Sequence, residues 1–201
     1  MELEFKDDFD RAVEQWERFW QGTNTRPAVC AVLPKPGVTP AERPGYASGA
    51  QEDFEPIVDQ LLAWAETHLF LADAIPYYYL EFSADHFAGL LGADLKFVDS
   101  GPGGWAVPFV KDLAQAEIRF DREGYWWKRT VAFAEALRSR CDGKLMIASP
   151  TLVANADALA AVYGAENLLI AMVEDPDAVH SALSQIDRAH AEILEALDEL
   201  L

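Results

Sequence analysis

The spacing of apolar residues predicts a chain built mainly of helices. Phe9, Val13, Trp16 and Trp20 recur at helical intervals, so we predict an amphipathic helix over Asp8–Gln21. The same criterion, together with capping residues and glycine stops, predicts six more helices, which are Glu52–Phe70, Ala84–Leu91, Asp121–Arg140, Asn155–Gly164, Glu166–Val173 and Asp175–Leu201.

Short apolar runs between these helices predict buried strands. The three runs are Ala28–Leu33, Asp73–Leu80 and Lys144–Ala148. Leu95–Val98 and Trp105–Phe109 flank the glycine-rich segment Ser100–Gly104 and predict a β-hairpin whose second arm lies at an edge, because it contains Pro108. Strands that alternate with helices indicate a parallel α/β sheet, and the absence of linkers or repeats indicates one domain over residues 1–201.

Three buried parallel strands are few for 201 residues. A sheet with an uncovered edge readily pairs with other chains. We therefore expect this chain to be the N-terminal part of a larger α/β barrel, or to be completed by a partner chain or a second copy.

The charge and cysteine content narrow the possible partners and location. The net charge of −18 disfavours binding to nucleic acids and to anionic membrane surfaces. The chain contains no apolar stretch long enough for a membrane span, and its N-terminus lacks the features of a signal peptide. With only Cys30 and Cys141, far apart in sequence, we expect a reducing, cytoplasmic location.

Candidate catalytic residues follow the second predicted strand, because active sites of parallel α/β folds form at the carboxyl ends of strands. Glu81, Asp85 and His86 place two carboxylates and an imidazole within six residues. A carboxylate there could protonate a carbon, act as a general base or bind a cation. Asp85 and His86 could instead belong to a surface turn of a helix.

Of these three residues, Glu81 and Asp85 are the catalytic candidates and His86 is a candidate for contact with a substrate, as are three other residues. Arg43 is the strongest anion-binding candidate in the long loop Pro34–Ala50. Tyr79 shares one strand face with Tyr77, where core packing is the default and a ring-lined pocket the alternative. Asn155 is either the N-cap of the helix that follows or a site residue. The cysteines and histidines lack metal-ligand spacing, so we predict no metal site in this chain.

Segments of the chain resemble the uroporphyrinogen decarboxylase superfamily. Pro76–Gly92 resembles the second strand and following helix of that superfamily, and the hairpin has the same placement. Ser149–Leu152, Asn155–Gly164 and Glu174–His180 resemble its third-strand exit and next helices. The resemblance implies a (β/α)8 barrel of the TIM type, of which this chain would supply about the first three βα units and the hairpin.

The resemblance also assigns positions in the site. The family's catalytic aspartate corresponds to Ser83, with Glu81 and Asp85 two residues to either side, and its active-site tyrosine falls at about Asn155. The family's arginine-bearing loop corresponds to a stretch whose nearby cations are Lys35 and Arg43. A substrate with many carboxylates needs more cations than this.

The resemblance therefore favours the branch of corrinoid-linked methyltransferases, in which a methyl group passes from a methyl-corrinoid to a thiol. This function implies zinc, with ligands in a C-terminal half beyond these residues, and a corrinoid carried by a partner protein. The first alternative is decarboxylation of a tetrapyrrole or another small acid, with Glu81 or Asp85 as the proton donor. The second alternative is an inactive half-barrel scaffold that needs a partner.

Overall fold

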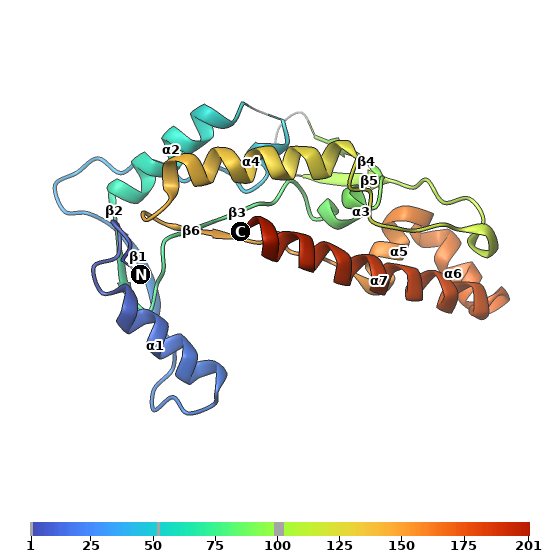
Figure 1. Cartoon of the computed structure of the whole chain (residues 1–201), viewed down its shortest axis with the longest axis horizontal. Coiled ribbons are helices and arrows are strands. Elements are labelled where there is room, and N and C mark those ends of the chain that lie inside the picture. The colour runs from blue at the N-terminus through green and yellow to red at the C-terminus, as the bar shows by residue number, and fades with distance from the viewer. Residues whose placement is uncertain (1, 52, 99–102) are drawn as a thin grey trace. The chain divides into compact units, whose positions relative to one another are not determined.

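The computed structural model describes residues 2–51, 53–98 and 103–201 and is 50% helical and 13% strand (Figure 1). Residue contacts divide the chain into two compact units. The first unit comprises Met1–Gly45, Glu52–Tyr79 and Glu135–Ala148, and the second comprises Tyr46–Gln51, Leu80–Ala134 and Ser149–Leu201.

The first unit contains two separate pairs of strands and two complete helices. Its elements are α1 (Phe9–Trp20), β1 (Cys30–Pro34), α2 (Phe54–Glu66), β2 (His68–Ala72), β3 (Tyr77–Tyr79) and β6 (Met146–Ala148). β1 and β2 are antiparallel, with Cys30 opposite Ala72. β3 and β6 are parallel, with Tyr79 opposite Ala148, so the chain leaves both strands in the same direction.

The second unit is mainly helical. Its elements are η1 (Ser48–Ala50), α3 (His86–Leu90), the antiparallel strands β4 (Asp94–Phe97) and β5 (Gly104–Val107), η2 (Leu113–Gln115), α5 (Asn155–Tyr163), α6 (Ala165–Glu174) and α7 (Pro176–Leu200). Helix α4 (Tyr125–Cys141) begins in this unit, and its residues from Glu135 onward belong to the first. α7 buries one stripe of side chains, and the Asp175 carboxylate caps it by accepting from the backbone N–H of Ala178 at 3.1 Å.

The prediction of a TIM-type barrel is wrong. Within the described residues, the strands form three two-stranded sheets, of which two are antiparallel. The run Ala28–Leu33, predicted as a buried parallel strand, is mostly exposed: Val32 and Leu33 are 43% and 51% accessible, and β1 pairs with β2 instead. β2 itself lies at the end of the segment predicted as the helix Glu52–Phe70.

Several local predictions are confirmed. The hairpin, the parallel pairing of β3 with β6 and the helices at Ala84–Leu91 and beyond Asn155 are present. The helix predicted from Asp121 begins later, at Tyr125, and Asp121 accepts a hydrogen bond from the N–H of Glu123 in the turn before it. Residues 52 and 100–102, which begin one predicted helix and form most of the predicted turn, lie outside the described residues.

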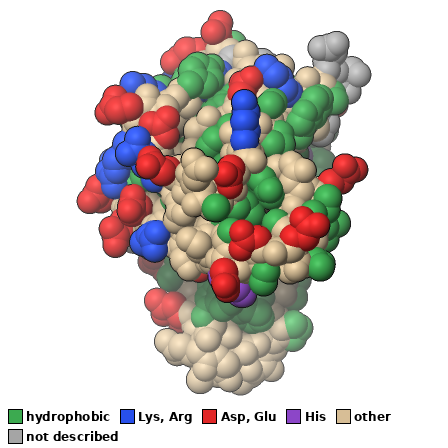
Figure 2. Space-filling model, turned by 90° about the vertical axis from the view of Figure 1, so that its right-hand side faces the viewer, with side chains coloured by type: hydrophobic (Ala, Val, Ile, Leu, Met, Phe, Trp, Pro, Cys, Tyr) green, Lys and Arg blue, Asp and Glu red, His purple; other side chains and the backbone are tan. Residues whose placement is uncertain are grey.

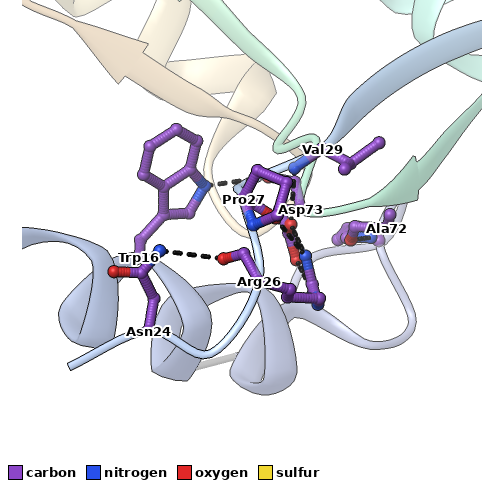
Figure 3. A network of polar contacts seen from close by, with 8 residues as sticks. Trp16, Asn24, Arg26, Pro27, Val29, Ala72 and Asp73 are labelled. Carbon is purple, nitrogen blue, oxygen red and sulfur yellow. Dashed lines mark hydrogen bonds and ion pairs between the residues drawn. The ribbon is translucent and has the colours of Figure 1, made fainter. Parts of the chain in front are cut away.

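A buried carboxylate organises the first unit. Asp73 is 2% exposed and pairs with both terminal nitrogens of the Arg26 guanidinium, at 2.6 and 2.7 Å (Figure 3). The carboxylate also accepts from the N–H of Val29 at 2.8 Å, while the indole N–H of Trp16 donates to the Asp73 carbonyl at 2.8 Å. The hydrogen bonds from Arg26 lower the pKa of Asp73 to about 2. The network joins α1, the chain before β1 and the chain after β2.

Replacing this carboxylate is expected to destabilise the first unit. Asp73→Asn removes the charge and sets an amide against Arg26, so we expect a loss of about 2 kcal/mol in the free energy of unfolding at pH 7. The matched control is Glu14→Gln, which breaks the exposed pair between Glu14 and Arg18 and should change stability by less than about 0.5 kcal/mol. Urea unfolding of both variants measures the difference, and equal losses would contradict this role for Asp73.

Candidate functional site

The polar residues that follow β3 gather in the second unit. Glu81 lies two residues beyond the end of β3, and Thr151 lies three residues beyond the end of β6. The N–H of Thr151 donates to Oε2 of Glu81 at 3.3 Å. The parallel pairing of the two strands explains this meeting, because it sends both chains out at the same edge.

Glu81 is a buried carboxyl group with an altered acidity. It is 7% exposed, and burial raises its pKa. Hydrogen bonds from the backbone and the side chain of Thr151 offset part of this rise. Within the described residues, no Lys or Arg side chain forms an ion pair with it. A carboxyl group that holds its proton at higher pH than usual is suited to donate that proton to a reacting atom.

Ser83 and Asp85 are engaged in local structure. Ser83 is fully buried, and its hydroxyl oxygen accepts from the N–H of Asp85 at 3.1 Å. Oδ2 of Asp85 in turn accepts from the N–H of Ala106 at 2.7 Å, which ties the start of α3 to β5. One oxygen of the Asp85 carboxylate is therefore held by the backbone, and its predicted catalytic role and the predicted substrate contact of Ser83 stay predictions.

His86 lies in the core of the second unit. It is fully buried and stacks on Phe82, with ring centroids 4.5 Å apart. Its Nε2 lies 3.0 Å from the hydroxyl of Thr130, and that hydroxyl donates its hydrogen to the carbonyl of Trp126 at 2.8 Å. Nε2 must therefore carry the hydrogen of the imidazole, and Nδ1 has no partner within the described part of the chain. Burial lowers the pKa of His86 to about 3, so the ring is neutral at pH 7.

Asn155 is exposed and is the first residue of α5. Its backbone has φ of 59°, a left-handed conformation that asparagine adopts more readily than most other residues. The residue in the N-cap position is Ala154, and no side-chain hydrogen bond caps the start of α5. The prediction of Asn155 as the N-cap is therefore wrong, while its alternative role as a site residue stays a prediction.

Arg43 and Tyr79 belong to the first unit. The Arg43 guanidinium lies 5.0 Å from the ring centroid of Trp64 and 4.9 Å from that of Tyr77, and it donates to the carbonyl of Tyr77 at 2.7 Å. Tyr79 is 38% exposed and packs edge-to-face on Tyr77 at 5.0 Å. These rings and the cation form a cluster at the surface of the first unit, in which Arg43 already has π and carbonyl partners.

Two polar residues of the second unit were not among the predicted site residues, and they are Thr151 and Thr130. Thr151 supplies hydrogen bonds to Glu81, and Thr130 fixes the tautomer of His86. Thr130 lies in the apolar stripe of its helix, with Trp126 one turn before it. Because buried polar groups are hydrogen-bonded, a hydroxyl in such a stripe indicates that a polar partner lies nearby.

Among residues 2–51, 53–98 and 103–201, no group of three His, Cys, Asp or Glu side chains is arranged to hold a metal ion. In the same residues, no single helix has the length and apolarity to cross a membrane, although α5 and α6 meet that criterion together as a pair bent by 111°.

No family model matches this chain, and neither the curated proteins nor the solved structures include a detectable relative. The resemblance to the uroporphyrinogen decarboxylase superfamily therefore stays a prediction.

Proposed function

We propose that this protein is an acid–base enzyme that acts on a small organic acid, with the Glu81 carboxyl group as the proton donor. The observation that supports it is a buried carboxyl group, held by Thr151 beyond the ends of two parallel strands. The reaction class is decarboxylation, the first alternative that the family resemblance implies.

The proposed step balances in protons and electrons. The bond between the substrate carbon and its carboxylate breaks, CO₂ leaves, and the electron pair stays on that carbon. Glu81 then transfers its proton to the carbon, and the resulting carboxylate takes a proton from water. Burial raises the pKa of Glu81, so this carboxyl group keeps its proton to a higher pH than an exposed glutamate does.

The scarcity of cations around Glu81 supports a substrate with few carboxylates. Glu81 has no cationic partner in the described residues. A substrate with one or two carboxylates suits these residues better than a polycarboxylate tetrapyrrole. We infer that the enzyme is cytoplasmic, because its only cysteines, Cys30 and Cys141, are far apart in sequence.

Methyl transfer from a corrinoid protein to a thiol is the other activity that the resemblance implies. The described residues contain no ligand set for its zinc. Neither this activity nor the role of an inactive scaffold has an observation of its own in this structure, and both stay predictions, as does assembly with a second copy or a partner chain.

The test is CO₂ release from a panel of acids that includes uroporphyrinogen, pyrrole monocarboxylates and β-keto acids. Glu81→Gln is expected to lower the rate on the best substrate by about a hundredfold, because the amide cannot donate a proton of comparable acidity. The control is Glu117→Gln, an exposed glutamate of the same unit, which should keep the full rate.

The activity should also fall as the pH rises above the pKa of Glu81. An unchanged rate in Glu81→Gln, or no CO₂ from any acid, would overturn the proposal.

A further inference from the structure

Helix α6 presents four large apolar side chains to solvent. Leu169, Ile170, Met172 and Val173 are 66%, 55%, 43% and 84% exposed, whereas Leu168 and Ala171 face the core. At about 100° per residue, the four exposed side chains occupy one broad side of the helix. We call these four residues the α6 patch. Clustered apolar side chains on a surface mark interaction sites more often than scattered ones do.

The surroundings of the α6 patch are acidic. Four exposed carboxylates belong to α6 or to the start of α7, and they are Glu166, Glu174, Asp175 and Asp177. None of them forms an ion pair within the described part of the chain. The sequence contains no Lys or Arg between Lys144 and Arg188. Figure 2 shows the side of the molecule that carries α6, where hydrophobic side chains and carboxylates reach the surface close to one another.

The geometry points to a basic, amphipathic partner: we propose that the α6 patch binds a protein helix whose apolar face is bordered by Lys or Arg. Such a helix buries the patch and sets its cations against the carboxylates at both ends of α6.

The negative charge of this protein disfavours two other occupants of the α6 patch. A second copy of the chain would bring the same carboxylates together on a protein of net charge −18. An anionic membrane surface would be repelled in the same way. The proposed interaction does not depend on the chemistry assigned to Glu81.

The test uses a synthetic amphipathic peptide built of Leu and Lys, with a matched Leu and Glu peptide that has the same apolar face. In titrations with the full chain, the fluorescence anisotropy of each labelled peptide measures its binding. The Lys peptide should bind, and the Glu peptide should bind at least about tenfold more weakly. The double variant Leu169→Gln with Val173→Gln should weaken binding of the Lys peptide at least about tenfold. The control is Leu194→Gln, an exposed leucine on α7, which should leave the affinity unchanged. Circular dichroism checks that each variant is folded.

Any of the following results would overturn the proposal that the α6 patch binds a basic amphipathic helix. Equal binding by the double variant and the control would mean that only general acidity attracts the peptide. Equal affinity for the Glu peptide would remove the charge argument, and no binding of the Lys peptide would remove the site. A dimer in sedimentation that Leu169→Gln with Val173→Gln dissociates would make the patch a self-association surface. Binding to phosphatidylcholine vesicles that the same double variant abolishes would make it a membrane contact.

Discussion

Between pH 6.5 and pH 3, the free energy of unfolding is expected to fall by roughly 4 kcal/mol on account of His86 alone. The ordinary pKa of 6.5 applies to the unfolded chain, and burial lowers the pKa to about 3 in the folded protein. Between these values the unfolded chain binds a proton that the folded protein does not bind. Unfolding therefore becomes more favourable as the pH falls through this range.

The hydrogen bonding of His86 strengthens the expectation. Because Nε2–H donates to Thr130, the incoming proton would have to enter on Nδ1, which has no acceptor beside it within the described residues. A buried N–H group without a partner adds its own penalty to that of the buried charge. The stacked ring of Phe82 offers no acceptor of comparable strength.

Chemical denaturation over a series of pH values measures this effect. His86→Gln removes the titrating group and keeps an N–H donor, so the variant should lose stability at pH 7 but show a flatter profile between pH 6.5 and pH 4. His180→Gln, which changes an exposed histidine on α7, should retain the full slope of the parent protein. Asp73 contributes in the same direction only at lower pH, between its ordinary pKa of 3.8 and about 2. A parent profile that His86→Gln leaves unchanged would contradict the assignment.

The sequence predicted the helices better than the sheets, for a physical reason. Helices such as α7 depend on local spacing and on caps such as Asp175, and both signals lie within a few residues of each other. The strand β2 was missed because its apolar residues continue the helical spacing of α2. α2 ends with Thr67 as its C-cap, and the Thr67 hydroxyl donates to the carbonyl of Ala63 at 2.8 Å, a contact with no distinctive sequence signal.

Sheet pairing could not be derived from single segments. Alternating helices and strands indicated that the three predicted buried strands are parallel, yet β1 pairs antiparallel with β2. The pairing depends on contacts distant in sequence, including Lys6, whose ammonium donates to the carbonyls of Phe70 and Ala72 at 2.9 and 2.8 Å. Nothing in the residues around Lys6 marks it as a buried group.

The candidate site was predicted in part. The rule that polar residues collect beyond strand ends located Glu81, and the parallel pairing of β3 with β6 explains why Thr151 meets it. The rule could not tell a solvent-facing imidazole from a buried one. His86 is buried because Thr130, distant in sequence, satisfies its N–H, and that partnership is visible only in the folded chain.

Gly49→Ala is expected to destabilise the second unit by about 3 kcal/mol, near the upper end of the usual range for overpacking. A Cβ atom on Gly49 would overlap Cε1 of the Phe133 ring and lie 2.7 Å from its Cδ1. The ring cannot retreat easily, because Phe133 is fully buried and stacks on Phe82 with centroids 6.2 Å apart. The Gly49 backbone is held as well, since its carbonyl accepts from Nε of Arg129 at 2.7 Å.

The matched control is Gly103→Ala, where the nearest atom to a new Cβ is a Val98 methyl at 3.4 Å, an ordinary contact. That change should shift the free energy of unfolding by less than about 0.5 kcal/mol. A double-mutant cycle then isolates the clash: Phe133→Leu destabilises the parent, but it should recover at least about 1 kcal/mol when combined with Gly49→Ala. Additive losses in the cycle would show that the cost of Gly49→Ala arises elsewhere. Recovery would establish that the loop before α2 is held against α4 by the direct contact of a glycine with an aromatic ring.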